Sequence, residues 1–104
     1  MELTVVVYRF SQSFPREEVY GLTSQIRRSA VSIPSNIAEG QGRLNTGEFR
    51  QFLGIVRGSN RELQTQLEIA RALGFGGIKL LDEAVSLSHE VGKMIYAILN
   101  SLSG

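Results

Sequence analysis

The sequence predicts an all-α protein: a single domain over residues 1–104 that folds as an up-and-down four-helix bundle. Its apolar residues recur every three or four positions along most of the 104 residues, which is the spacing of helices with one buried face. Only Pro15 and Pro34 interrupt this spacing, and the strongest loop signals are two short glycine-containing stretches, 40–42 and 74–77. Connections this short are typical of bundles whose neighbouring helices run antiparallel.

The first fourteen residues suit either a strand or a helix. The run 4–8, TVVVY, is rich in β-branched side chains, which favour strands on propensity alone. A helical face is also present, formed by Leu3, Val6, Val7, Phe10 and Phe14. A lone strand would have no partner in an otherwise helical chain, so we expect a helix here.

A second helix is expected from Pro15 onward. Proline suits the first helical position, and Glu17 and Glu18 favour the positive end of the helix dipole. The predicted buried face consists of Val19, Leu22, Ile26, Ala30, Ile33 and Ile37. This face continues beyond residue 34, so the helix is predicted to pass through its internal proline.

Pro34 is expected to kink this helix rather than end it. Proline has no N–H, so the carbonyl of Ala30 loses its usual helical donor, at a cost of about 3 kcal/mol or more. Ser32, Ser35 and Asn36 are the side chains expected to satisfy the freed backbone groups.

The third helix has clear signals at both ends. Asn45 can cap its N-terminus, with Glu48 three residues later as in a capping box, and Gly74 marks its end. Its predicted buried face consists of Phe49, Phe52, Val56, Asn60, Leu63, Leu67 and Ala70.

Asn60 is the one polar member of that face. A buried amide needs hydrogen-bond partners, because an unpaired polar group costs about 1–3 kcal/mol. We expect Gln25 or Asn36 of the preceding helix to pair with it, which would fix the register of the bundle.

The last helix, from about residue 78 to 102, is apolar over a wide arc. The arc contains Leu80, Leu81, Ala84, Val85, Leu87, Val91, Met94, Ile95, Ala97, Ile98 and Leu99. This exceeds the stripe that a helix needs to face one core. The surplus predicts a second buried surface, and hence self-association of the protein.

The residue inventory argues against an enzyme. The chain has no cysteine, and its single histidine, His89, falls on the polar side of the last helix. We find no Ser/His/Asp set and no histidine–carboxylate cluster for a metal. The glycines at 40 and 42 follow a helix and lack the rest of a dinucleotide fingerprint, so no cofactor is expected. No apolar run approaches the ~20 residues that cross a bilayer, and a cytoplasmic location is the default.

The distribution of charge is more informative than the net charge of +1. Residues 24–61 carry six arginines against two glutamates: Arg27, Arg28, Arg43, Arg50, Arg57 and Arg61. The last three lie within roughly 40° of one another around an ideal helix, and Gly54 and Gly58 share their side. Glycine inside a helix costs about 1 kcal/mol, so this pair indicates that something approaches the backbone closely.

Two stretches closely resemble a known protein family. Residues 14–43 read FPREEVYGLTSQIRRSAVSIPSNIAEGQGR, and residues 48–74 read EFRQFLGIVRGSNRELQTQLEIARALG. Both are similar to the four-helix-bundle proteins encoded in intervening sequences of bacterial 23S rRNA genes. The resemblance implies a proline-kinked second helix and a ring-shaped homo-oligomer, a pentamer in known relatives. One relative, the accessory protein of diversity-generating retroelements, binds nucleic acid and a reverse transcriptase through a basic surface.

We therefore predict a non-enzymatic, oligomeric bundle that binds structured RNA, such as rRNA, or nucleoprotein through the six arginines, which would contact phosphates. The alternative is a homo-oligomeric scaffold or adaptor, whose arginines and glycines form subunit or partner contacts. A third alternative is a small-molecule site beside Asn36 and Glu39, which would need a pocket of a few hundred Å³ there.

Overall fold

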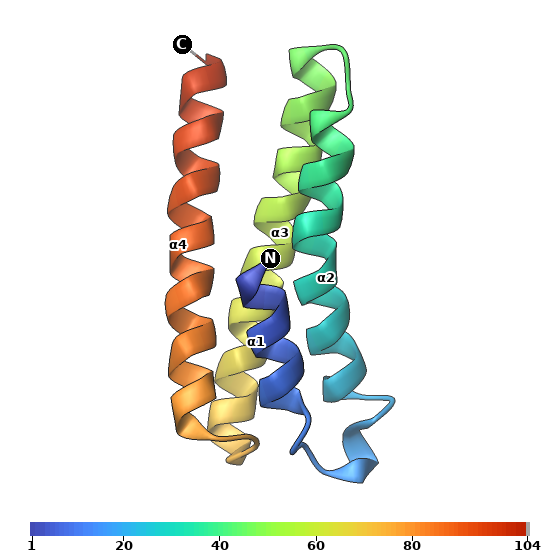
Figure 1. Ribbon diagram of the computed structural model, residues 1–104, viewed down its shortest axis with the longest axis vertical. Helices are drawn as coiled ribbons and strands as arrows, with labels where there is room; N and C mark the ends of the chain where they lie inside the picture. Colours follow the sequence, from blue (N-terminus) through green and yellow to red (C-terminus); the bar gives the residue numbers. More distant parts are fainter. Residues whose placement is uncertain (104) are drawn as a thin grey trace.

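A computed structural model describes residues 1–103 and shows an entirely helical architecture in this part of the chain (Figure 1). The elements are α1 (Glu2–Ser11), a 3₁₀ helix η1 (Arg16–Glu18), α2 (Leu22–Gln41), α3 (Thr46–Leu73) and α4 (Ile78–Ser103). Successive helices run in opposite directions, so the predicted all-α, up-and-down four-helix bundle is confirmed.

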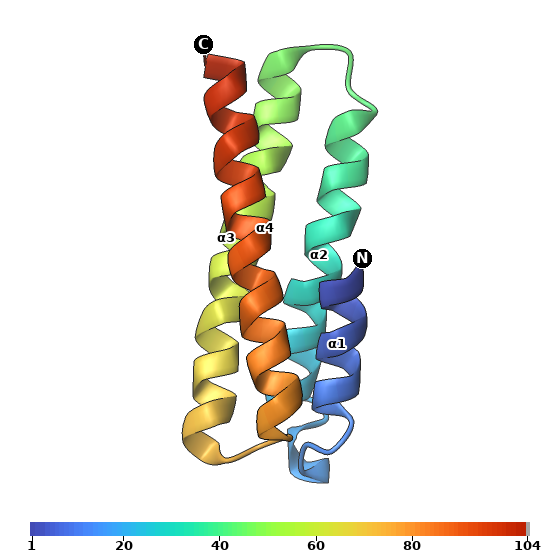
Figure 2. The same ribbon diagram turned by 60° about the vertical axis from the view of Figure 1, so that its left-hand side comes forward.

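The four helices differ strongly in length. α3 packs against both α2 and α4, and α1 lies in the space between α2 and α4 (Figures 1 and 2). α1 has 10 residues whereas α3 has 28, so α1 reaches only about halfway along the bundle. One half of the molecule therefore has four helices around its core, and the other half has three.

α1 resolves the ambiguity of the first residues in favour of a helix. Leu3, Val6, Val7 and Phe10 are all buried on one side of it. The ring of Phe10 meets the ring of Phe14 edge to face, with 5.1 Å between the centroids. Burial of this face outweighs the strand propensity of the β-branched run, since propensity is only a weak prior.

The expected start of the second helix at Pro15 is wrong. Pro15 instead precedes η1, and α2 begins only at Leu22. Val19, predicted to be buried, is 49% exposed. The reason is local, because Gly21 leaves the helical backbone region (φ −111°, ψ −116°) and the Glu18 carboxylate accepts the N–H of Leu22 at 3.0 Å. A side chain thus satisfies one of the free N–H groups at the start of α2.

α2 continues through Pro34, as predicted. The carbonyl of Ala30, which Pro34 deprives of its helical donor, accepts a hydrogen bond from the Thr4 hydroxyl of α1 at 3.0 Å. The sequence suggested partners on α2 itself, but none of their recorded bonds is to this carbonyl: the Asn36 amide donates to the carbonyl of Ser32 at 2.8 Å, which Pro34 does not free. Docking of α1 therefore compensates for part of what the proline removes.

α3 begins and ends as its sequence predicts. The Asn45 side chain accepts the N–H of Glu48 at 2.8 Å, and Gly74 ends the helix in the left-handed region with φ +72°. Gly76, at φ +74°, turns the chain against the ring of Phe10, where a Cβ would collide. Glycine is required at this second position both for its backbone conformation and for space.

Asn60 is buried as predicted, but its expected partners are wrong. Its amide donates to the carbonyl of Ser88 on α4 at 3.0 Å, and the Ser88 hydroxyl donates back to the Asn60 carbonyl oxygen at 2.7 Å. Asn36, one of the expected partners, instead bonds within α2. α3 packs against both α2 and α4, so its buried residues are divided between two neighbours. Asn60 is on the part that faces α4.

Candidate nucleic-acid interface

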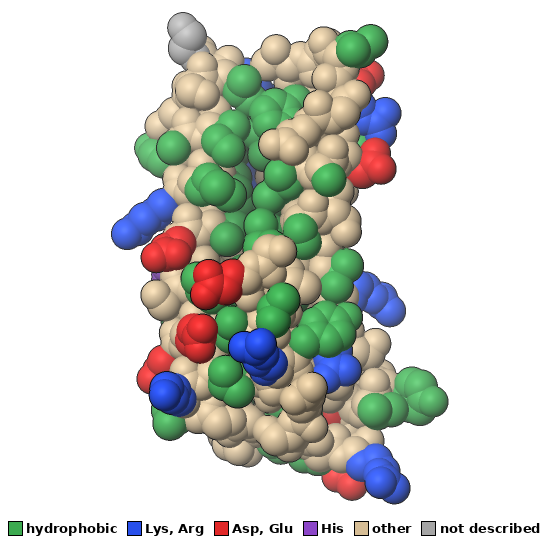
Figure 3. Space-filling view, viewed as in Figure 1, with side chains coloured by type: hydrophobic (Ala, Val, Ile, Leu, Met, Phe, Trp, Pro, Cys, Tyr) green, Lys and Arg blue, Asp and Glu red, His purple; other side chains and the backbone are tan. Residues whose placement is uncertain are grey.

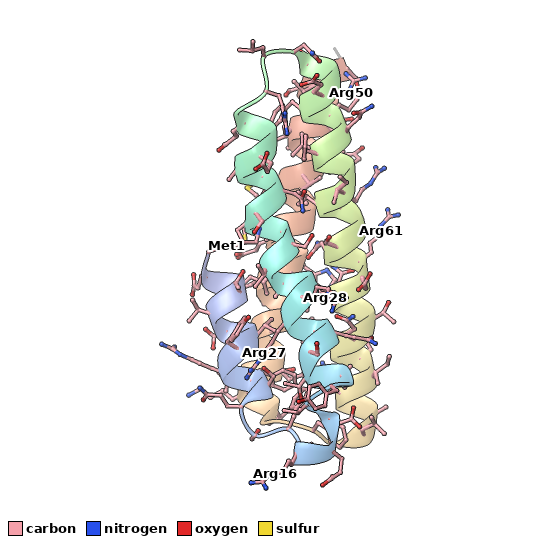
Figure 4. All side chains as sticks on the ribbon, turned by 90° about the vertical axis from the view of Figure 1, so that its right-hand side faces the viewer. Met1, Arg16, Arg27, Arg28, Arg50 and Arg61 are labelled. Carbon is pink, nitrogen blue, oxygen red and sulfur yellow. The ribbon has the colours of Figure 1, made fainter. Side chains whose placement is uncertain are left out.

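The six predicted arginines do not form one cluster. Arg50, Arg57 and Arg61 are all exposed along one flank of α3, and we call them the arginine row. Figure 4 shows Arg50 and Arg61 projecting from α3 on the side away from α2. The Arg50 guanidinium donates to the carbonyl of Leu102 at 2.9 Å, so this flank borders α4.

Arg27 has a structural role instead. Its guanidinium donates to the Ser11 hydroxyl at 2.8 Å and to the Tyr8 carbonyl at 3.4 Å. It also lies over the Tyr8 ring, 4.7 Å from the centroid, as a cation–π contact. Arg27 thus fastens α1 to α2. Arg28, its neighbour, is exposed on α2, and Figure 4 shows it apart from the arginine row.

Arg43, in the connection between α2 and α3, is occupied within the chain as well. It pairs with Glu39 at 3.1 Å, and its guanidinium lies 4.8 Å from the centroid of the Phe52 ring. The carboxylate offsets its charge locally. Of the six predicted site residues, the structure therefore brings together only the three on α3.

Two of the three glutamates of α3 are engaged away from the arginine row. Glu62 accepts hydrogen bonds from Ser29 and Gln66, toward α2. Glu68 lies 3.4 Å from Arg71, in the last turn of α3. Across residues 1–103, every ion pair shorter than 4 Å involves Arg43 or Arg71. None of the three arginines of the row therefore has a carboxylate within 4 Å in this part of the chain.

The backbone of α3 is open beside the arginine row. A Cβ built at Gly54 or Gly58 would have no atom within 4 Å other than those of its own surroundings in the helix. No other part of the described chain approaches these glycines. Close approach by another molecule, which the glycine pair predicts, stays a prediction.

Two straight lines of side chains face each other where α3 and α4 meet. Residues seven apart in a helix lie about 20° from one another, so such a line runs nearly parallel to the axis. We call this the α3–α4 boundary; the lines that border it consist of Arg50, Arg57, Gln64 and Arg71 of α3 and of Asp82, His89, Tyr96 and Ser103 of α4.

Contacts at both ends fix the register of these lines. Arg71 reaches Asp82 at 3.5 Å at one end, and Arg50 reaches the Leu102 carbonyl at 2.9 Å at the other. Because α3 and α4 are antiparallel, equal distances from the Arg71–Asp82 contact reach the same level on both helices. Two heptads from Arg71 lead back to Arg57, and two heptads from Asp82 lead on to Tyr96, so these two residues lie at the same level. Tyr96 is 69% exposed.

Sequence reasoning did not single out Tyr96, because no pattern within one helix shows what a neighbouring helix places opposite. It assigned His89, one heptad away, to the polar side of the last helix, and His89 is exposed. Tyr96 and His89 become candidates for the interface only because α4 packs on α3 and brings them to the boundary with the arginine row.

The comparison with protein families agrees with the fold. A family described as 23S rRNA-intervening sequence protein matches residues 1–97, nearly the whole chain. The chain belongs to this family. A search of curated proteins finds no match.

The geometry can also be compared with the other classes of site that the sequence raised. Within residues 1–103, His, Asp and Glu side chains form no group of three that could hold a metal ion. No helix in the same range combines the length and apolar character needed to cross a bilayer. A depression of about 290 Å³ lies near the α2–α3 connection, but neither Asn36 nor Glu39 lines it. The small-molecule site expected beside those two residues gains no support from this cavity.

Proposed function

We propose that this protein is a non-enzymatic, oligomeric helical bundle that binds structured RNA through the arginine row on α3. The observation that carries the proposal is the absence of an acidic partner, within the described chain, for three aligned and exposed arginines. Phosphates are the ligands that such a row suits, since arginine combines fixed charge with several N–H donors. Contacts of this kind position a nucleic acid and carry little sequence information.

Salt dependence provides the test. Fluorescence anisotropy would follow a labelled rRNA fragment titrated with protein between about 50 and 300 mM salt. Three neutralised phosphates predict a slope of log affinity against log salt between about −2.1 and −2.7, a loss of roughly 40- to 130-fold over this range.

Arg57 and Arg61 are the best pair for substitution, because Arg50 also bonds to α4. Changing both to alanine should reduce the magnitude of the slope by about 1.4–1.8. A matched control removes the same charge at Arg16 and Lys79, which are exposed and lie outside the arginine row. If the wild-type protein does not bind RNA at 50 mM salt, or if the control variant loses as much affinity as the test variant, the proposal fails.

Self-association is the second part of the proposal. Side chains on α4 stay exposed although they are apolar, among them Met94 and Ile78. Figure 3 shows apolar side chains gathered between α4 and α2 above the end of α1, where the bundle has only three helices. Unburied apolar surface of this kind favours contact with further copies. The resemblance described above implies five copies, and repeated weak sites on one particle would raise the avidity for RNA.

A homo-oligomeric scaffold is the competing function, and the open backbone at Gly54 and Gly58 favours it. In that case α3 would pack against another subunit, and the arginine row would meet carboxylates there. Light scattering coupled to size-exclusion chromatography measures the number of copies. Oligomers that dissociate when Arg57 and Arg61 are changed to glutamate, in a protein that does not bind RNA, would support the scaffold.

A further inference from the structure

An exposed aromatic ring, Tyr96, lies level with the arginine row along the α3–α4 boundary. The register set by the two end contacts places Tyr96 at the level of Arg57, one heptad along from Arg50. The cation–π contacts in residues 1–103 are those of Arg27 with Tyr8 and Arg43 with Phe52, so the Tyr96 ring is not covered by Arg57. The two groups that bind a nucleotide are therefore both available here: an aromatic ring for the base and a cation for the phosphate.

Other exposed rings do not have this setting. Tyr20 lies in the turn between η1 and α2, at the opposite end of the bundle from the start of α3 (Figure 1). Phe52 is half-buried and lies under the Arg43 guanidinium. Tyr8 is engaged by Arg27. Tyr96 is thus the exposed ring that the structure places next to arginines without acidic partners.

We propose that the α3–α4 boundary binds an unpaired nucleotide, with its base stacked on Tyr96 and its flanking phosphates bound by Arg57 and Arg50. This inference rests on the proposed function and narrows its ligand to RNA with single-stranded loops or bulges. Bases inside a duplex are stacked on one another and cannot reach a side-chain ring, whereas unpaired bases stack on aromatic side chains. A face of arginines alone would bind duplex and single strand alike through phosphates.

The experiment compares two labelled RNAs that carry equal numbers of phosphates: a hairpin with an unpaired loop and a blunt duplex. Tyr96→Ala should weaken binding of the hairpin by about 5- to 150-fold, the range measured for loss of one base–aromatic stack. Binding of the duplex should stay unchanged, as should the salt dependence for the hairpin, since the phosphate contacts remain. Tyr96→Phe keeps the ring and should bind the hairpin like the wild type.

Tyr20→Ala is the matched control, because it removes a still more exposed ring that is remote from the arginine row. Circular dichroism verifies that each variant retains its helices, which an exposed position favours. Equal hairpin affinity for Tyr96→Ala and the wild type overturns the inference, and so does an equal loss on the duplex. The proposed function survives those results if changing Arg57 and Arg61 still weakens binding, and it fails if the wild type binds neither RNA.

Discussion

The hydrogen bond from Thr4 to Ala30 offers a direct test of how this bundle accommodates a proline inside α2. Thr4→Val preserves the shape of the side chain but removes the hydroxyl that donates at 3.0 Å. Ala30 is fully buried and Pro34 supplies no N–H, so the carbonyl loses its donor without gaining contact with water. An unsatisfied buried group costs about 1–3 kcal/mol, and we expect the free energy of unfolding to fall by that amount.

A second substitution separates this bond from every other role of Thr4. Pro34→Ala restores an N–H that can donate to the Ala30 carbonyl as in any helix. In the Pro34→Ala background the Ala30 carbonyl keeps a donor when the Thr4 hydroxyl is removed. Thr4→Val should then cost only about 0.5 kcal/mol, the low end of the net contribution of one hydrogen bond. The coupling free energy between the two substitutions should therefore be about 0.5–2.5 kcal/mol.

Urea denaturation followed by circular dichroism would give the free energies of unfolding of the wild type, both single variants and the double variant. Thr65→Val is the control, because its hydroxyl donates at 3.2 Å to the Arg61 carbonyl on the exposed side of α3. That carbonyl also keeps its helical donor, so the loss should stay within about 0.5 kcal/mol. The reasoning is refuted if Thr4→Val costs no more than the control, or if its cost is the same in both backgrounds.

Three further predictions concern single positions. Asn60→Leu should lower the free energy of unfolding in urea by about 1–3 kcal/mol, since it leaves the buried serine hydroxyl of α4 without a partner. Gly76→Ala should lower the melting temperature by about 4–8 °C for each kcal/mol lost, because its φ of +74° is strained for alanine and its Cβ meets Phe10. Gly54→Ala and Gly58→Ala should each stabilise the single chain by about 0.8–1 kcal/mol, as their Cβ atoms would meet open space. A loss of stability in either glycine variant, at a concentration where the oligomer is dissociated, would contradict that account.

The parts of the fold that could be predicted from the sequence are those that short-range chemistry determines. The ends of α3 followed from Asn45 and Gly74, whose cap geometries depend on a few neighbouring residues. The start of α2 could not be predicted in the same way, because proline, two glutamates and an apolar residue at 15–19 all fit a helix. The start of α2 is determined by Gly21, which has a non-helical conformation, and by the Glu18 side chain, which accepts a hydrogen bond from the N–H of Leu22.

The candidate site shows the same division. The arginine row could be predicted because its members share one helix, where spacing alone gives direction. The engagement of Arg27 with α1 and of Arg43 with Phe52 depends on how helices pack, and sequence spacing carries no information on that. The partner of Asn60 was misassigned for this reason too: the sequence showed that the residue is buried but not which neighbour it faces.

Packing of α4 on α3 connects the core to the proposed interface. The reciprocal bonds between Asn60 and Ser88 are satisfied in only one register, and they lie midway between the contacts at the two ends of the α3–α4 boundary. A slip of α4 by one turn would displace it by about 5.4 Å, separate this buried pair and carry Tyr96 away from Arg57. Two well-packed apolar residues could hold the helices together as firmly, but they would tolerate such a slip better than a pair of polar groups that must find each other. The buried polar pair therefore contributes to the surface, because it fixes which side chain of α4 stands beside the arginine row.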